Sequence, residues 1–453
     1  MTDSERAVTA DTIFALASGP GRSGVAVFRL SGPAAKLAVE TLAGRLPQPR
    51  RATVRRIVDP RSGACIDEAL IVWMPSPHSF TGEDVAEFHT HGGRAVAAAM
   101  LAALGSLPGC RCAEPGEFAR RAFEAGRLDL AQVEGLADLI EAETEMQRKL
   151  ALRQAGGELS RIMATLRERL IGTMALVEAA IDFADEGDVA ADATAQAENM
   201  ARLLREDLLR YLEDNRRGEI VREGYKVVLA GPPNAGKSSL LNRLARRDAA
   251  IVSAEPGTTR DTIEIRLDLD GMAVVLTDTA GLREADSEIE REGIRRTIRS
   301  IGDADLMIWV AAPDAPGGDA DAVIDRAEAV PPSVLHVMNK GDLLPEAGTM
   351  DDDRLLVSAQ TGAGIDVLVA RIAALAADRI GPQDGPVLTH ARHRHLIDRA
   401  SRELDAFLGA GDADLELRAE HLRSAAAALA RMTGRLDVED VLDQVFGRFC
   451  IGK

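Results

Sequence analysis

The sequence predicts a multidomain α/β protein in which an all-α domain is interrupted by an inserted, doubly wound α/β domain. Three changes of pattern along the chain predict it. Residues 1–122 mix strand-like and helical stretches, whereas residues 128–215 contain no proline and repeat apolar residues at helical spacing. Residues 225–379 alternate short apolar strands with helices, which is typical of a mostly parallel sheet, and helical patterns then return.

The predicted domain boundaries follow these changes. An inserted domain requires that its two ends lie close together, so the helical segments on either side of it are assigned to one discontinuous domain. The domains are residues 1–122 (N-terminal α+β), 123–217 (first helical part), 218–379 (inserted domain) and 380–453 (second helical part).

Individual elements can be placed within these domains. The N-terminal domain should have strands at residues 12–18, 25–32, 68–75 and 85–91, with the turn GPGRSG between the first two. Its helices are expected at residues 33–46, which begin with proline, and at 94–107. In the inserted domain, AAPDAPGGDADA is expected to be a flexible loop.

Composition excludes several classes of protein. Hydrophobic residues make up 46% of the 453 residues, and no window holds the ~20 uninterrupted apolar residues of a membrane span. The polar start lacks an apolar signal segment, and four cysteines are too few for a disulfide framework, so a cytoplasmic protein without membrane association is expected. A net charge of −18 argues against broad electrostatic binding of nucleic acid by this chain alone.

A phosphate-binding loop is predicted at GPPNAGKSS, which follows the strand YKVVLA and precedes a helix, as G-x-x-x-x-G-K-[ST] requires. Backbone N–H groups and the helix N-terminus would hold the β-phosphate. Lys237 would reach the β- and γ-phosphate oxygens, and Ser238 would hold Mg²⁺. Taken alone, this stretch could also be a glycine-rich structural turn.

Further motifs identify the nucleotide as GTP. The strand MAVVLTD ends in Asp278, placed to hold Mg²⁺ through water, and Gly281 follows it to meet the γ-phosphate. A later strand ends in NKGD, where the Asp342 carboxylate can accept from guanine N1–H and the 2-amino group. Adenine offers neither donor, so ATP would leave this carboxylate unpaired. Backbone N–H groups near Ala359 are expected to meet guanine O6.

The catalytic groups are less clear from the motifs. Thr259, in the loop EPGTTRDT, is the candidate switch threonine for Mg²⁺. Leu282 follows DTAG and cannot orient the attacking water as the glutamine of Ras-like enzymes does. Arg260 and Arg283 are interpreted as salt-bridging surface residues rather than arginine fingers. Acidic candidates for the water-orienting role, which position alone does not rank, are Glu284, Glu288, Glu290 and Glu292.

With these motifs, the chain resembles the tRNA modification GTPase family MnmE, also called TrmE, over essentially its whole length. The G motifs alone are shared with the ribosome-assembly GTPases Era and Der. Far more specific are PGRSGVAVFRLSG, FTGEDVAEFHTHGG, PGEFARRAFEAGRLDLAQVEGLADLI and the terminal FCIGK. The resemblance implies an N-terminal folate-binding-like domain and an inserted Ras-like P-loop GTPase domain.

The resemblance also implies an activity and partners. Family G domains hydrolyse GTP after dimerising around K⁺, and the N-terminal domain forms a constitutive homodimer. With the FAD protein MnmG, in a heterotetramer or larger complex, the family modifies C5 of the wobble uridine of certain tRNAs. It adds an aminomethyl or carboxymethylaminomethyl group, with 5-formyl- or 5,10-methylene-tetrahydrofolate as the implied one-carbon donor.

Several site residues are assigned by this resemblance. The K⁺ ligands correspond to Asn234, Ser253, Glu255 and Thr258, mostly through backbone carbonyls, and K⁺ would take the place of an arginine finger. The last glutamate of DTAGLREADSEIE matches the water-orienting glutamate, which singles out Glu290. The resulting GTP site comprises Asn234, Ala235, Gly236, Lys237, Ser238, Ser239, Ser253, Ala254, Glu255, Pro256, Gly257, Thr258, Thr259, Asp278, Thr279, Ala280, Gly281, Asn339, Lys340, Gly341, Asp342, Ser358, Ala359 and Gln360.

For the folate, Arg29, Glu87 and Lys453 match family positions, and Arg127 stands where lysine is common. A carboxylate suits the paired donors of a pterin ring, and cations suit the carboxylate tail. The apolar chain end is expected to be docked and not frayed, which would place Lys453 beside the folate. Cys450 would then lie near the one-carbon donor, where a thiolate could act as nucleophile, with simple packing as the alternative.

Three alternatives stay open. His89 and His91 form an H-x-H pattern without an evident third metal ligand, and Cys110 and Cys112 lack partner cysteines for zinc and are interpreted as structural thiols. The chain could instead be an Era- or Der-like ribosome-assembly GTPase. It could also be a scaffold in which GTP drives domain closure and the partner performs all modification chemistry.

Overall fold

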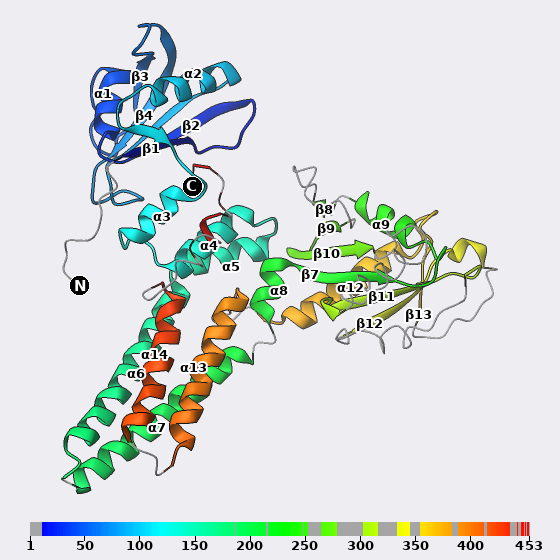
Figure 1. Cartoon of the computed structure of the whole chain (residues 1–453). Coiled ribbons are helices and arrows are strands. Elements are labelled where there is room, and N and C mark those ends of the chain that lie inside the picture. The colour runs from blue at the N-terminus through cyan, green and yellow to red at the C-terminus, as the bar shows by residue number, and fades with distance from the viewer. Residues whose placement is uncertain are drawn as a thin grey trace, which may run out of the picture. The chain divides into compact units, whose positions relative to one another are not determined.

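The structure is a computed structural model of the whole chain (Figure 1). It describes residues 11–185, 187–213, 216–247, 249–251, 264–278, 302–315, 333–344, 354–382, 388–411, 415–434, 442, 445–447, 449 and 451–452. The chain divides into two compact units. The first comprises Met1–Ala137, Ala155–Met163 and Ala430–Lys453, and the second comprises Asp138–Gln154 and Ala164–Leu429.

The first unit contains an N-terminal α+β fold. Its elements are β1 (Thr12–Leu16), β2 (Ser23–Ser31), α1 (Ala35–Ala43), β3 (Thr53–Val58), β4 (Cys65–Met74), β5 (Val85–Gly92), α2 (Arg94–Gly105), β6 (Cys110–Cys112) and α3 (Glu117–Glu124). The four strands and two helices expected for this domain are confirmed, whereas β3 and β6 were not predicted. Both are edge strands, and β6 is too short to show an alternating pattern.

The six strands form one sheet in the order β3-β4-β5-β2-β1-β6. Neighbours are antiparallel except β1 and β6, which are parallel. Helices α1 and α2 cover one face, where alternate strand residues such as Phe14, Phe28 and Phe88 are buried (Figure 1). The period of two leaves Arg29 and Glu87 on the opposite, half-exposed face, because each is adjacent in sequence to a buried residue.

The chain end belongs to the same unit. Phe446 and Phe449 are 3% and 5% exposed and pack with Ala119 of α3 and with Leu130 and Val133 of α4 (Leu130–Glu141). The prediction of an apolar, docked chain end is therefore confirmed for the described residues near the C-terminus.

Long helices precede and follow the inserted domain in the sequence. They are α5 (Glu145–Ala155), α6 (Glu158–Asp182), α7 (Gly187–Leu212), α13 (Ala391–Gly409) and α14 (Leu415–Met432). Within the second unit, α6, α7, α13 and α14 form a bundle with buried leucines at the predicted helical spacing (Figure 1). Ion pairs cross between its helices, including Arg169–Asp207 between α6 and α7 at 2.5 Å.

The inserted domain has a doubly wound, mostly parallel sheet, as predicted. Its elements are α8 (Arg217–Glu223), β7 (Tyr225–Ala230), α9 (Lys237–Ala245), β8 (Ala250–Ile251), β9 (Glu264–Leu269), β10 (Met272–Asp278), β11 (Leu306–Ala311), β12 (Val334–Met338), η2 (Gly341–Leu343), β13 (Arg354–Leu356) and α12 (Ile365–Ile380). The strand order is β13-β12-β11-β7-β10-β9-β8, with β8 and β9 as an antiparallel edge.

The two ends of this insertion meet, as insertion into another domain requires. Helices α8 and α12 are in contact, and a Cβ added to Gly381 would lie 3.1 Å from Arg217 Cζ. In the described part of the chain, no helix has the length and apolar character needed to cross a membrane.

Candidate functional site

The phosphate-binding loop joins the end of β7 to the start of α9. Gly231 has φ +143°, and a Cβ added there would lie 2.1 Å from the Val310 carbonyl oxygen, so the close approach to β11 requires glycine. Asn234 and Gly236 are also left-handed, with φ of 60° and 85°. Backbone turns of this kind form the concave amide surface that binds phosphate.

Lys237 and Ser238 begin α9 and reach in different directions. Lys237 is 8% exposed, and its Nζ donates to the carbonyl oxygens of Gly231 (2.7 Å) and Pro232 (2.9 Å). Burial lowers the pKa of Lys237, although the nearby Asp278 carboxylate opposes that shift. Ser238 Oγ donates to Asp278 Oδ2 at 2.6 Å, which brings together the hydroxyl and the carboxylate predicted for Mg²⁺.

Asn339 links three loops that are far apart in the sequence. Its Nδ2 donates to the carbonyl oxygens of Ala235 (3.0 Å) and Gly236 (3.3 Å) in the phosphate loop. Its Oδ1 accepts from the backbone N–H of Ala359 (3.0 Å), so the residue predicted to meet guanine O6 is held by the NKGD motif. Asn339 is 1% exposed, and these hydrogen bonds orient its side-chain amide.

Asp342 is oriented by the loop that follows β13. Ser358 Oγ donates to Asp342 Oδ1 (2.5 Å), and Thr361 N donates to Ser358 Oγ (3.1 Å). This places the predicted guanine acceptor on the same side of the sheet as Asn339 and Ala359. The described residues of the predicted nucleotide site thus converge at the carboxyl ends of the parallel strands, where ligands bind in doubly wound folds.

Part of the predicted nucleotide site lies outside the described residues. These positions are Ser253, Ala254, Glu255, Pro256, Gly257, Thr258, Thr259, Thr279, Ala280, Gly281 and Glu290. Of the residues predicted to bind K⁺, the structure therefore describes Asn234, and of the two predicted to bind Mg²⁺ directly it describes Ser238.

A second candidate site lies on the half-exposed face of the N-terminal sheet. Arg29 and Glu87 face each other across β2 and β5, and Arg29 Nε is 3.0 Å from Glu87 Oε1. The Arg29 guanidinium lies over two aromatic rings, with its Cζ 5.5 Å from the centroid of Phe80 and 5.9 Å from that of Phe118. His89, two residues along β5, places Nε2 3.3 Å from Glu87 Oε2. Both carboxylate oxygens of Glu87 therefore have cationic or N–H partners.

The loop at residues 80–83 connects this pair to Arg127. A Cβ added to Gly82 (φ +82°) would lie 3.5 Å from Arg127 Cγ, so the arginine stem passes over this glycine. The same loop is anchored by Arg121, which is 4% exposed and places Nη1 3.2 Å from both oxygens of Glu83. Arg29 and Arg127 thus flank one short loop.

The chain end lies beside β1 in the same unit (Figure 1). Ile451 forms an antiparallel bridge with Pro115, and a Cβ added to Gly452 (φ +106°) would lie 2.5 Å from the Leu16 carbonyl oxygen. Ala15, one residue before Leu16, pairs with Arg29 across β1 and β2. The described tail therefore ends near the Arg29–Glu87 pair, whereas Cys450 and Lys453 themselves lie outside the described residues.

Several residues around these sites escaped prediction. Phe80 and Phe118 were not singled out because an isolated aromatic is more often a core residue, although both lie within segments that carried the family resemblance. His89 contacts Glu87 and His91 contacts Asp67 (2.8 Å), so the H-x-H side chains pair with separate carboxylates. Cys110 is half-buried, but Cys112 is exposed, so the interpretation of both as structural thiols fails for Cys112.

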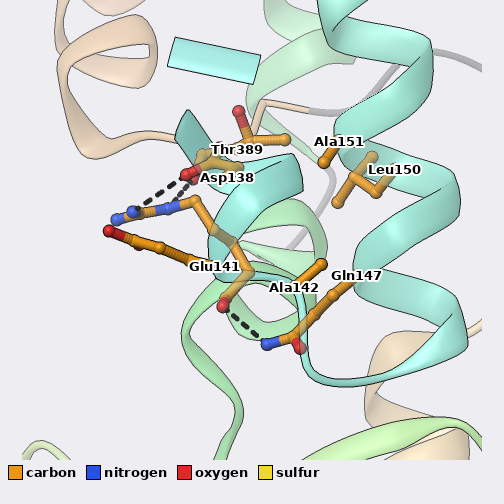
Figure 2. A pocket seen from close by; sticks show the side chains of 8 residues that line it. Asp138, Glu141, Ala142, Gln147, Leu150, Ala151 and Thr389 are labelled. Carbon is orange, nitrogen blue, oxygen red and sulfur yellow. Dashed lines mark hydrogen bonds and ion pairs between the residues drawn. The ribbon is translucent and has the colours of Figure 1, made fainter. Parts of the chain in front are cut away.

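A small cavity of about 40 Å³ lies where the insertion meets the segment Asp138–Gln154 (Figure 2). His390 Nε2 is 3.0 Å from Asp138 Oδ2, and Arg222 Nη1 is 3.6 Å from Asp138 Oδ1. Gln147 Nε2 donates to the Arg222 carbonyl (3.0 Å). These bonds attach the chain at the start of the inserted domain and just after its end to the segment Asp138–Gln154. We therefore interpret this cavity as part of a structural attachment and not as a ligand site.

Comparison with known proteins shows matches to two models of one protein family. The family model described as MnmE helical domain matches residues 130–450, and the model described as GTP-binding protein TrmE N-terminus matches residues 12–127. A relative from Parvibaculum lavamentivorans, named tRNA modification GTPase MnmE, is 51% identical over 98% of this chain and 100% of its own length. Relatives of the same name from a Methylobacterium species and from Methylorubrum populi are 51% and 52% identical over 98% of this chain, and are themselves covered over 100% and 99%.

Proposed function

Because this chain belongs to the MnmE (TrmE) family of tRNA modification GTPases, we propose that it is a K⁺-activated GTPase that acts with an FAD-dependent MnmG partner on tRNA. Family membership makes it a GTP hydrolase of tRNA modification that uses GTP and Mg²⁺. The proposed modification is at C5 of the wobble uridine, where an aminomethyl or carboxymethylaminomethyl group is added. The observation that carries this proposal is the docked chain end beside the Arg29–Glu87 pair.

The nucleotide site supports GTP as the ligand. Asp342 would accept from the guanine N1–H and 2-amino donors, while the Ala359 N–H held by Asn339 would donate to O6. Lys237 would exchange its two loop carbonyls for phosphate oxygens, since an ammonium gains more from anions than from neutral acceptors. Ser238, with Thr259, would hold Mg²⁺, and Asp278 would orient the metal-bound water.

For hydrolysis, we assign the K⁺ ligands to Asn234, Ser253, Glu255 and Thr258, and the water-orienting role to Glu290. The position of Asn234 within the phosphate loop, with a left-handed backbone, supports this assignment. K⁺, when bound, would supply the positive charge that an arginine finger supplies in other GTPases. GTP turnover in KCl should exceed that in NaCl at the same ionic strength, and equal rates would refute the potassium mechanism.

We assign Arg29, Glu87, Arg127 and Lys453 to a tetrahydrofolate derivative, 5-formyl- or 5,10-methylene-tetrahydrofolate. The Glu87 carboxylate suits the paired donors of a pterin edge, and Arg127 suits the carboxylate tail. Arg29→Ala should abolish binding of 5-formyl-tetrahydrofolate measured by calorimetry. Arg61→Ala is a matched control, because Arg61 also pairs with a carboxylate of the same domain, Asp59 at 2.9 Å, on the exposed surface. Equal affinity of the two variants would contradict the folate assignment.

The chemical role of Cys450 distinguishes two functions of this chain: direct participation in the modification chemistry, or a scaffold for a partner that performs it. If its thiolate attacks the one-carbon unit, Cys450→Ser should abolish wobble-uridine modification while GTP turnover stays intact. Full modification by this variant would favour the scaffold alternative, in which the partner performs all the chemistry.

The proposed assembly is a homodimer through the N-terminal domain, joined to MnmG in a heterotetramer or larger complex. Because the chain carries a net charge of −18, MnmG is expected to supply much of the basic surface for tRNA. Strong, salt-sensitive tRNA binding by this chain alone would contradict that division of roles.

A further inference from the structure

Asp314 lies in a tight turn directly after β11. Ala315 N donates to the Ala312 carbonyl (3.0 Å), and the two residues also form an isolated bridge. Pro313 occupies the second position of this turn, where its fixed φ favours the turn geometry. The described start of the stretch expected to be a flexible loop is therefore ordered, and it presents the Asp314 carboxylate in one place.

The partner of this carboxylate is the lysine of the NKGD motif. Lys340 Nζ lies 2.7 Å from Asp314 Oδ2 and 2.9 Å from Oδ1, and this bond lowers the pKa of Asp314. Lys340 has a left-handed backbone (φ 57°), which a lysine keeps only where its surroundings hold it. Asn339 N donates to the Ala311 carbonyl (2.8 Å), so the NKGD loop and the Asp314 turn share one attachment to β11.

The stem of Lys340 runs beside the phosphate loop. Its Cε would lie 3.9 Å from a Cβ on Gly236, while its ammonium group reaches Asp314. A guanine bound at its edge by Asp342 needs an apolar surface against its ring, and the methylene groups of an extended lysine provide one. We propose that Asp314 is a positioning residue for the guanine site, which keeps the Lys340 stem extended as one wall of the base slot. This inference rests on the proposed GTP site.

The test uses the full chain and a double-mutant cycle. Asp314→Asn, Lys340→Gln and the double variant are compared for affinity toward fluorescent GTP and GDP analogues, and for kcat and KM. Asp314→Asn should weaken both nucleotides equally, by about two- to five-fold, as expected for an exposed ion pair that orders a side chain. KM should rise with kcat unchanged, Asp314→Glu should restore part of the affinity, and the Lys340→Gln background should remove the effect.

Asp366→Asn is the matched control. Asp366 is an exposed carboxylate on α12, and its Oδ1 lies 2.6 Å from Arg247 Nη2. The nucleotide affinity of Asp366→Asn should equal that of the unaltered protein. The proposal is overturned if Asp314→Asn binds nucleotide as well as or better than this control. It is also overturned if the loss persists in the Lys340→Gln background, because Asp314 would then act through the fold. If Asp342→Asn also leaves GTP binding intact, the guanine site itself is misplaced, which separates failure of the proposed function from failure of this inference.

Discussion

The placement of the chain end can be tested at Gly452. Gly452 has φ +106°, and a Cβ there would lie 2.5 Å from the Leu16 carbonyl oxygen and 2.9 Å from Ala17 Cα. Both neighbours are backbone atoms of or beside β1, which cannot move without disturbing the sheet. Gly452→Ala should therefore release the tip from β1 and leave the rest of the fold intact.

The magnitude follows from two costs. A left-handed backbone costs an alanine about 1–2 kcal/mol, and the overlap with a backbone oxygen adds to it. A total of about 2 kcal/mol would lower the ratio of docked to released tip roughly 30-fold. If Lys453 and Cys450 act on the folate, modification should fall with this ratio, whereas GTP hydrolysis in the other unit should not change.

The assay is nucleoside analysis of wobble uridine in tRNA from cells that express the variant, together with GTP turnover and 5-formyl-tetrahydrofolate affinity of the purified protein. Gly44→Ala is a matched control, because Gly44 also has positive φ (+82°) but nothing within 4 Å of an added Cβ. If Gly452→Ala modifies tRNA and binds folate as well as Gly44→Ala, the docked tip has no role in the site. Removal of residues 450–453 should give the same separation of the two activities.

Three further predictions concern the inserted domain and its root. Asn339→Ala removes the bonds that Nδ2 donates to the phosphate-loop carbonyls and the bond that Oδ1 accepts from Ala359 N–H, so GTP and GDP affinity should each fall at least tenfold by equilibrium titration. Unchanged affinity would contradict the linking role of Asn339. Because burial lowers the pKa of Lys237 and only the charged amine stabilises bound phosphate, GTP affinity should be full below that pKa. GTP affinity should decline as pH rises through the pKa of Lys237, and the decline should begin at a lower pH than for an ordinary lysine. Lys237→Arg should make GTP affinity nearly independent of pH over the same range. Asp138→Ala leaves His390 and Arg222 without their buried carboxylate, so denaturant unfolding should show a loss of about 1–3 kcal/mol. Asp398→Ala, which removes a half-exposed carboxylate paired with Arg402 on α13, should cost much less.

Local sequence patterns were sufficient for most elements of the fold. The strands β2, β4 and β5 alternate over much of their length because one face of the sheet is buried, and that period of two is visible within each strand. The phosphate loop is likewise local, since its glycines and Lys237 act within nine consecutive residues. By contrast, β3 and β6 lie at sheet edges, where partial exposure weakens the pattern, and neither was predicted.

The composition of the sites depended on contacts between distant segments. Arg29 and Glu87 could be assigned individually by family resemblance, but their pairing follows from strand register, which brings residues 58 positions apart within 3.0 Å. The rings of Phe80 and Phe118 around Arg29 follow from the same packing and have no sequence signature.

The sequence by itself determined the GTP motifs, the order of the domains and the apolar character of the chain end. Those features depend on short-range spacing, backbone propensity and hydrophobic period, all of which one chain segment carries alone. Only the tertiary structure decided that Asp314 holds Lys340, that Asn339 joins three loops, and that Gly452 fits against Leu16. Each of these contacts joins residues that are far apart in the sequence, so no local pattern predicts it. The packing of the sheet and helices brings the residues within bonding distance.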